Sequence, residues 1–196
     1  MQGEAYRIIY LHVPCAASAF LASAILAVFG LWGITRRSET ALIYQRATAE
    51  VGFLFTVATL ITGSIWGRPI WGTWWTWDAR LTTTLLLAIL YFGYLVLYTS
   101  MAPDALRTRV CSVLALIIFV DVPIIYKSVN WWRTLHQPQT ILRDGGSTMD
   151  PVMLQALMFS VLAMLTLITW LIIARARNLA TAERVESISQ NMMQGK

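Results

Sequence analysis

Aromatic side chains crowd one short segment of the chain. Between Trp66 and Trp77, five of twelve residues are tryptophans, and the segment continues with Asp78, Ala79 and Arg80. The indole ring presents a large, rigid apolar face that stacks on flat conjugated rings, and it also anchors proteins at the membrane interface. Two interpretations are therefore open: a binding platform for a planar apolar ligand, or an interfacial aromatic belt.

The two histidines of the chain are its candidate metal ligands. His12 lies near the start of an apolar segment, and His136 follows Trp131 and Trp132 in a polar stretch. Paired neutral imidazoles on opposite faces of a porphyrin hold heme iron, whereas a structural zinc site needs four ligands and usually includes cysteine. A lone loop histidine is more often merely polar, so the heme interpretation depends on both histidines coinciding with the tryptophans.

Arginine and aspartate residues near the tryptophans could complete such a site. The planar guanidinium suits carboxylates such as heme propionates, and it suits lipid headgroups equally well. We expect Asp78, at the start of a predicted helix, to complement the helix dipole and, with Arg80, to brace the loop. The candidate arginines are Arg7, Arg68, Arg80, Arg133 and Arg143.

Composition indicates that lipid is the main solvent of the chain. Its mean hydropathy is +0.60, and only 13% of its 196 residues are charged, about half the fraction in soluble domains. A spanning helix needs about 20 mostly apolar residues. The sequence therefore predicts an all-α integral membrane protein, one domain over 1–196, a bundle of about five transmembrane helices. They are predicted at about 10–33, 45–66, 81–101, 110–128 and 151–173.

The distribution of basic residues predicts the orientation. Nine basic residues flank one side of the predicted helices and six the other, and the richer side is expected in the cytoplasm. The tryptophan-rich loop 66–82 and the loop 129–150 then lie outside, and the tail 174–196 lies inside. No run of five basic residues occurs, so the net charge of +5 reflects membrane topology and no nucleic-acid partner is expected.

With this orientation, tryptophans gather on one side of the membrane. Seven lie on the outer side, against Trp32 and Trp170 near the inner side. An aromatic belt occupies both interfaces. The asymmetry therefore favours the binding platform.

Cysteine and aspartate residues within the predicted helices have mainly structural interpretations. Cys15 and Cys111 are predicted near opposite membrane faces, too far apart for a disulfide. Asp121 lies two residues before Pro123 inside the fourth predicted helix. A protonated Asp121 could donate to a backbone oxygen that the proline leaves free, or it could act in a proton relay.

Three segments together resemble a known family. Residues 71–82 resemble the tryptophan-rich signature of heme-handling membrane proteins, and residues 6–14 and 129–137 resemble the two histidine segments of the heme exporter protein C family of cytochrome c maturation. The resemblance spans roughly residues 4–175. Members of that family usually have six helices, one more than predicted here, and the missing helix would be the first.

The resemblance implies a function, a cargo and partners. Heme b would be held transiently and non-covalently on the outer leaflet of the bacterial inner membrane, the organellar inner membrane being the alternative. It would then pass to a periplasmic heme chaperone, with ABC transporter subunits and a small membrane subunit as further partners. His12 and His136 fall on the positions of the axial iron ligands. The other implied binding residues are Trp71, Trp74, Trp75, Trp77, Asp78, Arg80, Trp131, Trp132, Arg68 and Arg133.

Two other functions remain open. A cytochrome c heme lyase of the same superfamily would share the tryptophans, but its aspartate is generally followed by proline and an acid, and it carries further intramembrane histidines. Asp78-Ala79-Arg80 and a total of two histidines disfavour that function. An autonomous heme transporter would need a phosphate-binding glycine loop or inverted repeats, which the sequence does not show. Enzymatic activity is not expected beyond, at most, a heme–chaperone ligation step.

Overall fold

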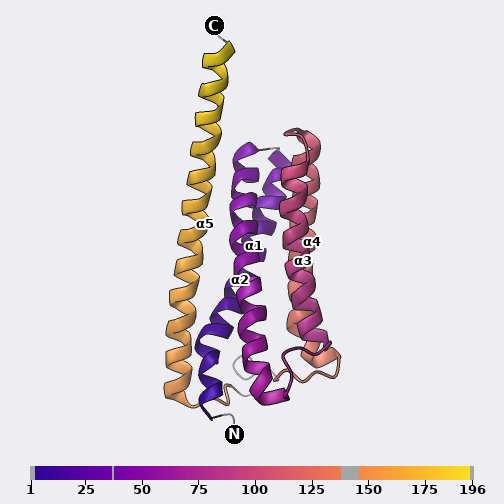
Figure 1. Ribbon diagram of the computed structural model, residues 1–196, viewed down its shortest axis with the longest axis vertical. Helices are drawn as coiled ribbons and strands as arrows, with labels where there is room; N and C mark the ends of the chain where they lie inside the picture. Colours follow the sequence, from indigo (N-terminus) through magenta and orange to yellow (C-terminus); the bar gives the residue numbers. More distant parts are fainter. Residues whose placement is uncertain (1–2, 37, 138–145, 195–196) are drawn as a thin grey trace.

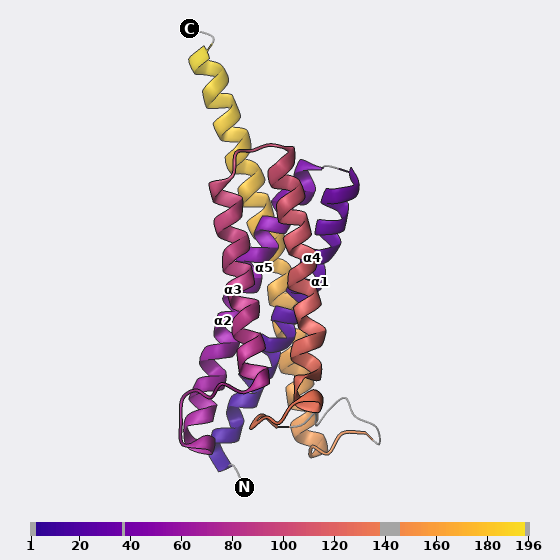
Figure 2. The ribbon, with the colours of Figure 1, turned by 90° about the vertical axis from the view of Figure 1, so that its right-hand side faces the viewer.

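Five long helices run side by side along the longest axis of the molecule (Figures 1 and 2). The structure is a computed structural model that describes residues 3–36, 38–137 and 146–194. After a short 3-10 turn, η1 (Gly3–Ile8), the helices are α1 (Ile9–Arg36), α2 (Glu39–Trp71), α3 (Ala79–Ser100), α4 (Ala105–Trp131) and α5 (Pro151–Gln194). All five are long and apolar enough to cross a membrane. The predicted all-helical fold with five apolar helices is confirmed.

Local signals determine where the helices begin and end. Ser38, Asp78 and Asp104 each accept, through the side chain, a hydrogen bond from the backbone N–H three residues further on, which satisfies a donor that the first helical turn leaves free. Helix α2 ends at Gly72, whose φ of 77° is left-handed and favours glycine. Non-helical backbone therefore connects α2 and α3 only over residues 72–78, and the beginning and end of the predicted loop 66–82 are helical.

Close helix approach at small residues holds the bundle together. Helix α1 packs against α2, α4 and α5, and α3 packs against α2 and α4. A Cβ on Gly30 would lie 2.9 Å from the Cβ of Ala115, and one on Gly52 would lie 2.6 Å from the Tyr91 ring. Small residues permit such contacts between membrane helices, where van der Waals packing replaces the hydrophobic effect.

A buried polar network joins four helices in the half of the bundle away from the N-terminus. Gln45 of α2 donates from Nε2 to the Phe29 carbonyl of α1 at 3.0 Å and to Ser112 Oγ of α4 at 3.1 Å. The Tyr94 hydroxyl of α3 donates to Gln45 Oε1 at 3.3 Å. Because Gln45 is fully buried, these bonds satisfy a group that would be costly to leave unpaired.

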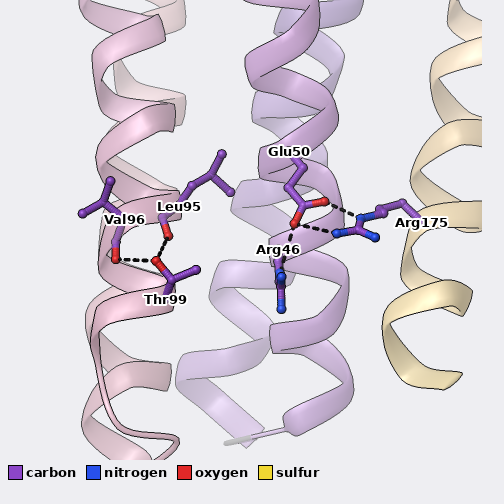
Figure 3. Close-up of polar contacts among 6 residues, drawn as sticks. All are labelled: Arg46, Glu50, Leu95, Val96, Thr99 and Arg175. Atoms are coloured by element: carbon purple, nitrogen blue, oxygen red, sulfur yellow. Dashed lines mark hydrogen bonds and ion pairs between the residues drawn. The ribbon is translucent and has the colours of Figure 1, made fainter. Parts of the chain in front are cut away.

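Helix α5 packs on α1 and α2 at one side of the bundle, and its C-terminal part extends beyond the other helices (Figures 1 and 2). Arg175 of α5 reaches Glu50 of α2 with two nitrogens, and Arg46 donates to the same carboxylate at 3.0 Å (Figure 3). These ion pairs connect α5 to α2. The helix continues without a break through the predicted tail 174–196 as far as Gln194.

Cys15 and Cys111 are both free and buried, and they belong to different core clusters. The prediction that they form no disulfide is confirmed.

Asp121 is 4% exposed, and neither carboxylate oxygen has a hydrogen-bond partner among the described residues. The hydrogen bond that a protonated Asp121 could donate to a backbone oxygen near Pro123 is therefore not formed.

Candidate functional site

His12 and His136 meet at the end of the bundle where α1 begins and α2 ends. Their ring centroids lie 6.4 Å apart, and the ring planes are inclined by 37°. His12 belongs to the first turns of α1, whereas His136 belongs to the connection between α4 and α5. Both side chains are half-buried. The fold thus brings together two histidines that are separated by most of the chain.

A threonine of α2 determines which nitrogen of His12 is free. His12 Nδ1 lies 3.0 Å from Thr62 Oγ1. The Thr62 hydroxyl lies 2.7 Å and 3.1 Å from the carbonyl oxygens of Ala58 and Thr59. Those carbonyls only accept, so the hydroxyl proton points to them and Thr62 Oγ1 accepts from His12 Nδ1–H. The lone pair of His12 then lies on Nε2, where it can bind a metal.

His136 has the same tautomer for a different reason. Its Nδ1 lies 3.0 Å from the carbonyl oxygen of Gln137, which can only accept, so Nδ1 carries the proton and Nε2 the lone pair. Burial lowers the pKa of His136 below its ordinary value, and the nearby positive charge of Arg80 lowers it further. The imidazole is therefore neutral near pH 7 and able to act as a ligand.

Asp78 positions the His136 loop. Its Oδ1 accepts from the backbone N–H of Leu81 at 2.9 Å and so caps α3. Its Oδ2 accepts from the Thr134 hydroxyl at 2.7 Å and from the Leu135 backbone N–H at 3.2 Å. Thr134 Oγ1 in turn accepts from the His136 backbone N–H at 3.1 Å. Asp78 therefore links the start of α3 to the segment that carries His136.

Seven tryptophans surround the histidines or lie on neighbouring segments of the same end. The Trp66 ring centroid is 6.3 Å from that of His136, and Trp66 meets Trp71 edge-on at 4.9 Å. Trp75 and Trp77 form a second edge-on pair, and Trp131 and Trp132 a third. The side chains that remain more than half exposed are Trp74, Trp77, Trp131 and Trp132.

Buried polar atoms of the tryptophan-rich segment lack partners among the described residues. These atoms are Trp75 Nε1, Thr76 Oγ1 and Arg80 Nε. Arg80 also donates from its terminal nitrogen to the Tyr126 carbonyl oxygen at 3.0 Å, which joins α3 to α4.

The predicted arginines occupy different surroundings. Arg68 donates to the Gly72 carbonyl oxygen and closes the end of α2, whereas Arg133 is exposed beside the exposed tryptophans. Arg7 pairs with Glu4 at 2.9 Å on the surface. Arg143 lies outside the described residues.

Sequence reasoning missed two residues that support the histidines, Thr62 and Thr134. Trp66 was predicted only as part of the tryptophan-rich loop 66–82. Thr62 and Trp66 are four positions apart, so they lie on one face of α2. That spacing, next to the tryptophan-rich segment, was the available signal.

The fold and this site define a class: a multi-pass helical membrane protein with paired histidines beside a tryptophan-rich segment. Comparison with known proteins gives the family. The family model described as heme exporter protein C matches residues 1–191, and the chain belongs to that family.

Several relatives show the extent of the similarity. The chain is 43% identical over 178 residues to heme exporter protein C of Escherichia coli (strain K12), covering 91% of this chain and 71% of the relative. It is 38% identical over 193 residues to heme exporter protein C of Bradyrhizobium diazoefficiens, covering 98% and 73%. It is 41% identical over 146 residues to a putative cytochrome c biosynthesis CcmC-like mitochondrial protein of Marchantia polymorpha, covering 74% and 61%.

Proposed function

We propose that this protein binds heme b non-covalently at the outer face of the bacterial inner membrane and delivers it to a periplasmic heme chaperone during cytochrome c maturation. Membership of the heme exporter protein C family supports the heme cargo and the pathway. The site itself supports the mode of binding, in which His12 and His136 are the two axial ligands of the iron.

The distance between the histidines carries this proposal. Metal–nitrogen bonds to imidazole are about 2 Å long, so two rings facing one metal from opposite sides have centroids roughly 6 Å apart. The observed separation of 6.4 Å fits that requirement. Both Nδ1 atoms are engaged by hydrogen bonds, which leaves both Nε2 atoms for the iron.

Aromatic and cationic side chains would hold the rest of the porphyrin. The rings of Trp74, Trp75 and Trp77 offer stacking surfaces, with further contacts from Trp71, Trp131 and Trp132. The exposed guanidinium groups of Arg133 and Arg68 suit the propionates. Arg80 and Asp78 contribute mainly by holding the segments together.

The cationic side chains also support the orientation. The described basic residues at the end of the bundle away from the histidines include Arg36, Arg107 and Arg109, with Arg175 and Arg177 on α5. Positive-inside topology would place that end in the cytoplasm and the histidines in the periplasm. ABC transporter subunits and a small membrane subunit are the proposed partners, because these 196 residues contain no phosphate-binding glycine loop.

Absorption spectra of the heme-loaded protein in detergent test the ligand assignment. We expect a six-coordinate, low-spin spectrum. His12→Ala or His136→Ala should give a five-coordinate spectrum or lower heme occupancy, and added imidazole should restore the six-coordinate form. Thr166→Ala, on the exposed face of α5, is the matched control. Unchanged spectra in both single histidine variants would refute the assignment.

A further inference from the structure

We propose that His136 is the ligand that leaves the iron first when heme is handed over, that its release requires breaking the contact between Asp78 and Thr134, and that His12 stays bound until an acceptor has taken hold. This inference rests on the proposed function, because it assumes that both histidines bind the iron. It adds an order of release, and it assigns positioning roles to Thr134 and Thr62.

His12 is held by two packed helices. Its ring lies against α2, where a Cβ on Gly63 would be only 3.1 Å from His12 Cε1. Its Nδ1 partner, Thr62, is 7% exposed and bonded to the backbone of the preceding turn. Moving His12 off the iron would therefore require separating α1 from α2 or breaking the partly buried hydrogen bond across them.

His136 is held in a different way, because its hydrogen bonds are local and only its ring approaches a helix, near Trp66 of α2. Its Nδ1 bond goes to the carbonyl of its own neighbour, Gln137, and its backbone N–H bonds to Thr134 Oγ1. Both bonds lie within the segment 134–137 and can move with it. The bonds that tie this segment to a helix are those from Thr134 and Leu135 to Asp78 Oδ2.

The geometry of Asp78 allows the contact to break without unfolding a helix. The cap of α3 uses Oδ1, whereas the loop uses Oδ2. Leu135 is 55% exposed, so the segment that must move lies at the surface. Loss of the Thr134 and Leu135 bonds to Oδ2 would thus free the segment that carries His136 while α3 keeps its cap. His12, by contrast, stays packed between two helices.

Carbon monoxide binding to the ferrous heme-loaded protein tests the order, because the gas can bind only after one histidine has left. Thr134→Val removes the hydroxyl that donates to the carboxylate, and we expect the binding rate to rise about tenfold, the size of effect given by a hydrogen bond to a charged group. Thr134→Ser should restore the original rate. Thr62→Val is the matched control and should change the rate less than Thr134→Val does, because the packing of His12 against Gly63 of α2 remains.

A vibrational measurement on the same samples identifies the histidine that remains. After photolysis of the carbon monoxide, the iron–histidine stretching band reports the retained ligand. Thr62→Val should shift this band, because Thr62 accepts from the Nδ1–H of His12, whereas Thr134→Val should leave it unchanged. Thr62→Ser should restore it.

A rate that responds more to Thr62→Val than to Thr134→Val would overturn the proposed order, and so would an iron–histidine band that Thr62→Val leaves unchanged. The single-histidine spectra separate this outcome from failure of the proposed function. If those spectra show that the iron does not use both histidines, the premise fails. If those spectra show both ligands but the rate does not respond mainly to Thr134→Val, or the band does not respond to Thr62→Val, only the order of release is wrong.

Discussion

At the scale of single residues, the two histidines have the same tautomer through unlike neighbours. Thr62 accepts from His12 across a helix interface, while the backbone of Gln137 accepts from His136 within one segment. A neutral histidine can bind a metal only through the ring nitrogen that keeps its lone pair. The residues around the histidines therefore determine the chemistry as much as the histidines themselves do.

The protonation of His136 gives a prediction at this scale. Burial and the charge of Arg80 lower the pKa of His136. An unperturbed histidine has a pKa of about 6.5, so His136 in the folded protein should take up its proton only at a lower pH. As pH falls below 6.5, the unfolded chain binds this proton before the folded chain does, so the His136 contribution lowers the free energy of unfolding on acidification. Above that pH both states are neutral and the contribution is absent.

Carbon-13 NMR of selectively labelled histidine in the apoprotein measures this directly, because the chain contains only two histidines. His12→Gln assigns the remaining signal to His136. We expect its titration midpoint to lie below 6.5 and to move upward in Arg80→Gln, which removes the repelling charge. Arg133→Gln, an exposed position, is the control. A titration midpoint at 6.5 that stays the same in Arg80→Gln would contradict the prediction.

The sequence predicted part of this site for physical reasons. Histidine is rare in the chain, and its coincidence with the tryptophans pointed to His12 and His136, which the fold brings together. Thr134 gave no such signal and Thr62 gave only its four-residue spacing from Trp66, since threonine is common and its role depends on contacts between distant segments. Asp78 was expected to brace the loop near the helix start, but its second oxygen reaches a loop 56 residues away, a distance that no local pattern encodes.

At the scale of helices, hydropathy predicts the apolar middle of each element better than its ends. The predicted helix 45–66 lies inside α2, but α2 continues through Trp71 because Gly72 provides the left-handed end. Helix α5 continues to Gln194, and residues 174–194 contain no glycine or proline that would stop it. Caps and breakers define helix ends, whereas lipid contact depends on hydropathy.

The attachment of α5 to α2 gives a prediction at this scale. Glu50 and Arg175 form a bidentate pair whose side chains are 26% and 41% exposed. Partial exposure weakens ion pairs by solvent screening, so we expect a coupling free energy of about 1 kcal/mol, between the values for surface and buried pairs. A double-mutant cycle of Glu50→Gln and Arg175→Gln, read by thermal unfolding in detergent, measures it.

Arg177→Gln is the matched control for this cycle, because Arg177 lies two residues further along α5 and forms no ion pair in the part of the chain that the structure describes. The change in the free energy of unfolding caused by Arg177→Gln should simply add to the change caused by Glu50→Gln. A Glu50–Arg175 coupling no larger than the Glu50–Arg177 coupling would show that α5 is held by apolar packing alone.

At the scale of the whole molecule, the site lies at one end of the bundle, and several of its tryptophans are exposed. Trp74 is 58% exposed and Trp77 is 76% exposed. A heme held there would keep an edge open to an acceptor, whereas a heme enclosed between helices would be harder to release. This placement favours a delivery role over the covalent attachment that a cytochrome c heme lyase performs.

Mixing experiments with purified proteins distinguish these roles. Heme-loaded protein mixed with apo heme chaperone should lose its absorption spectrum as the chaperone gains heme, because a ligand from the acceptor can replace a histidine on the iron. Mixing with apocytochrome c alone should yield no covalent product, since the two histidines are both assigned to holding the cargo and no third histidine is present in the chain. Combined alanine substitution of Trp74, Trp75 and Trp77 should weaken transfer, whereas Trp32→Ala, at the opposite end of α1, should not. Covalent attachment of heme to apocytochrome without the chaperone would instead identify the protein as a lyase.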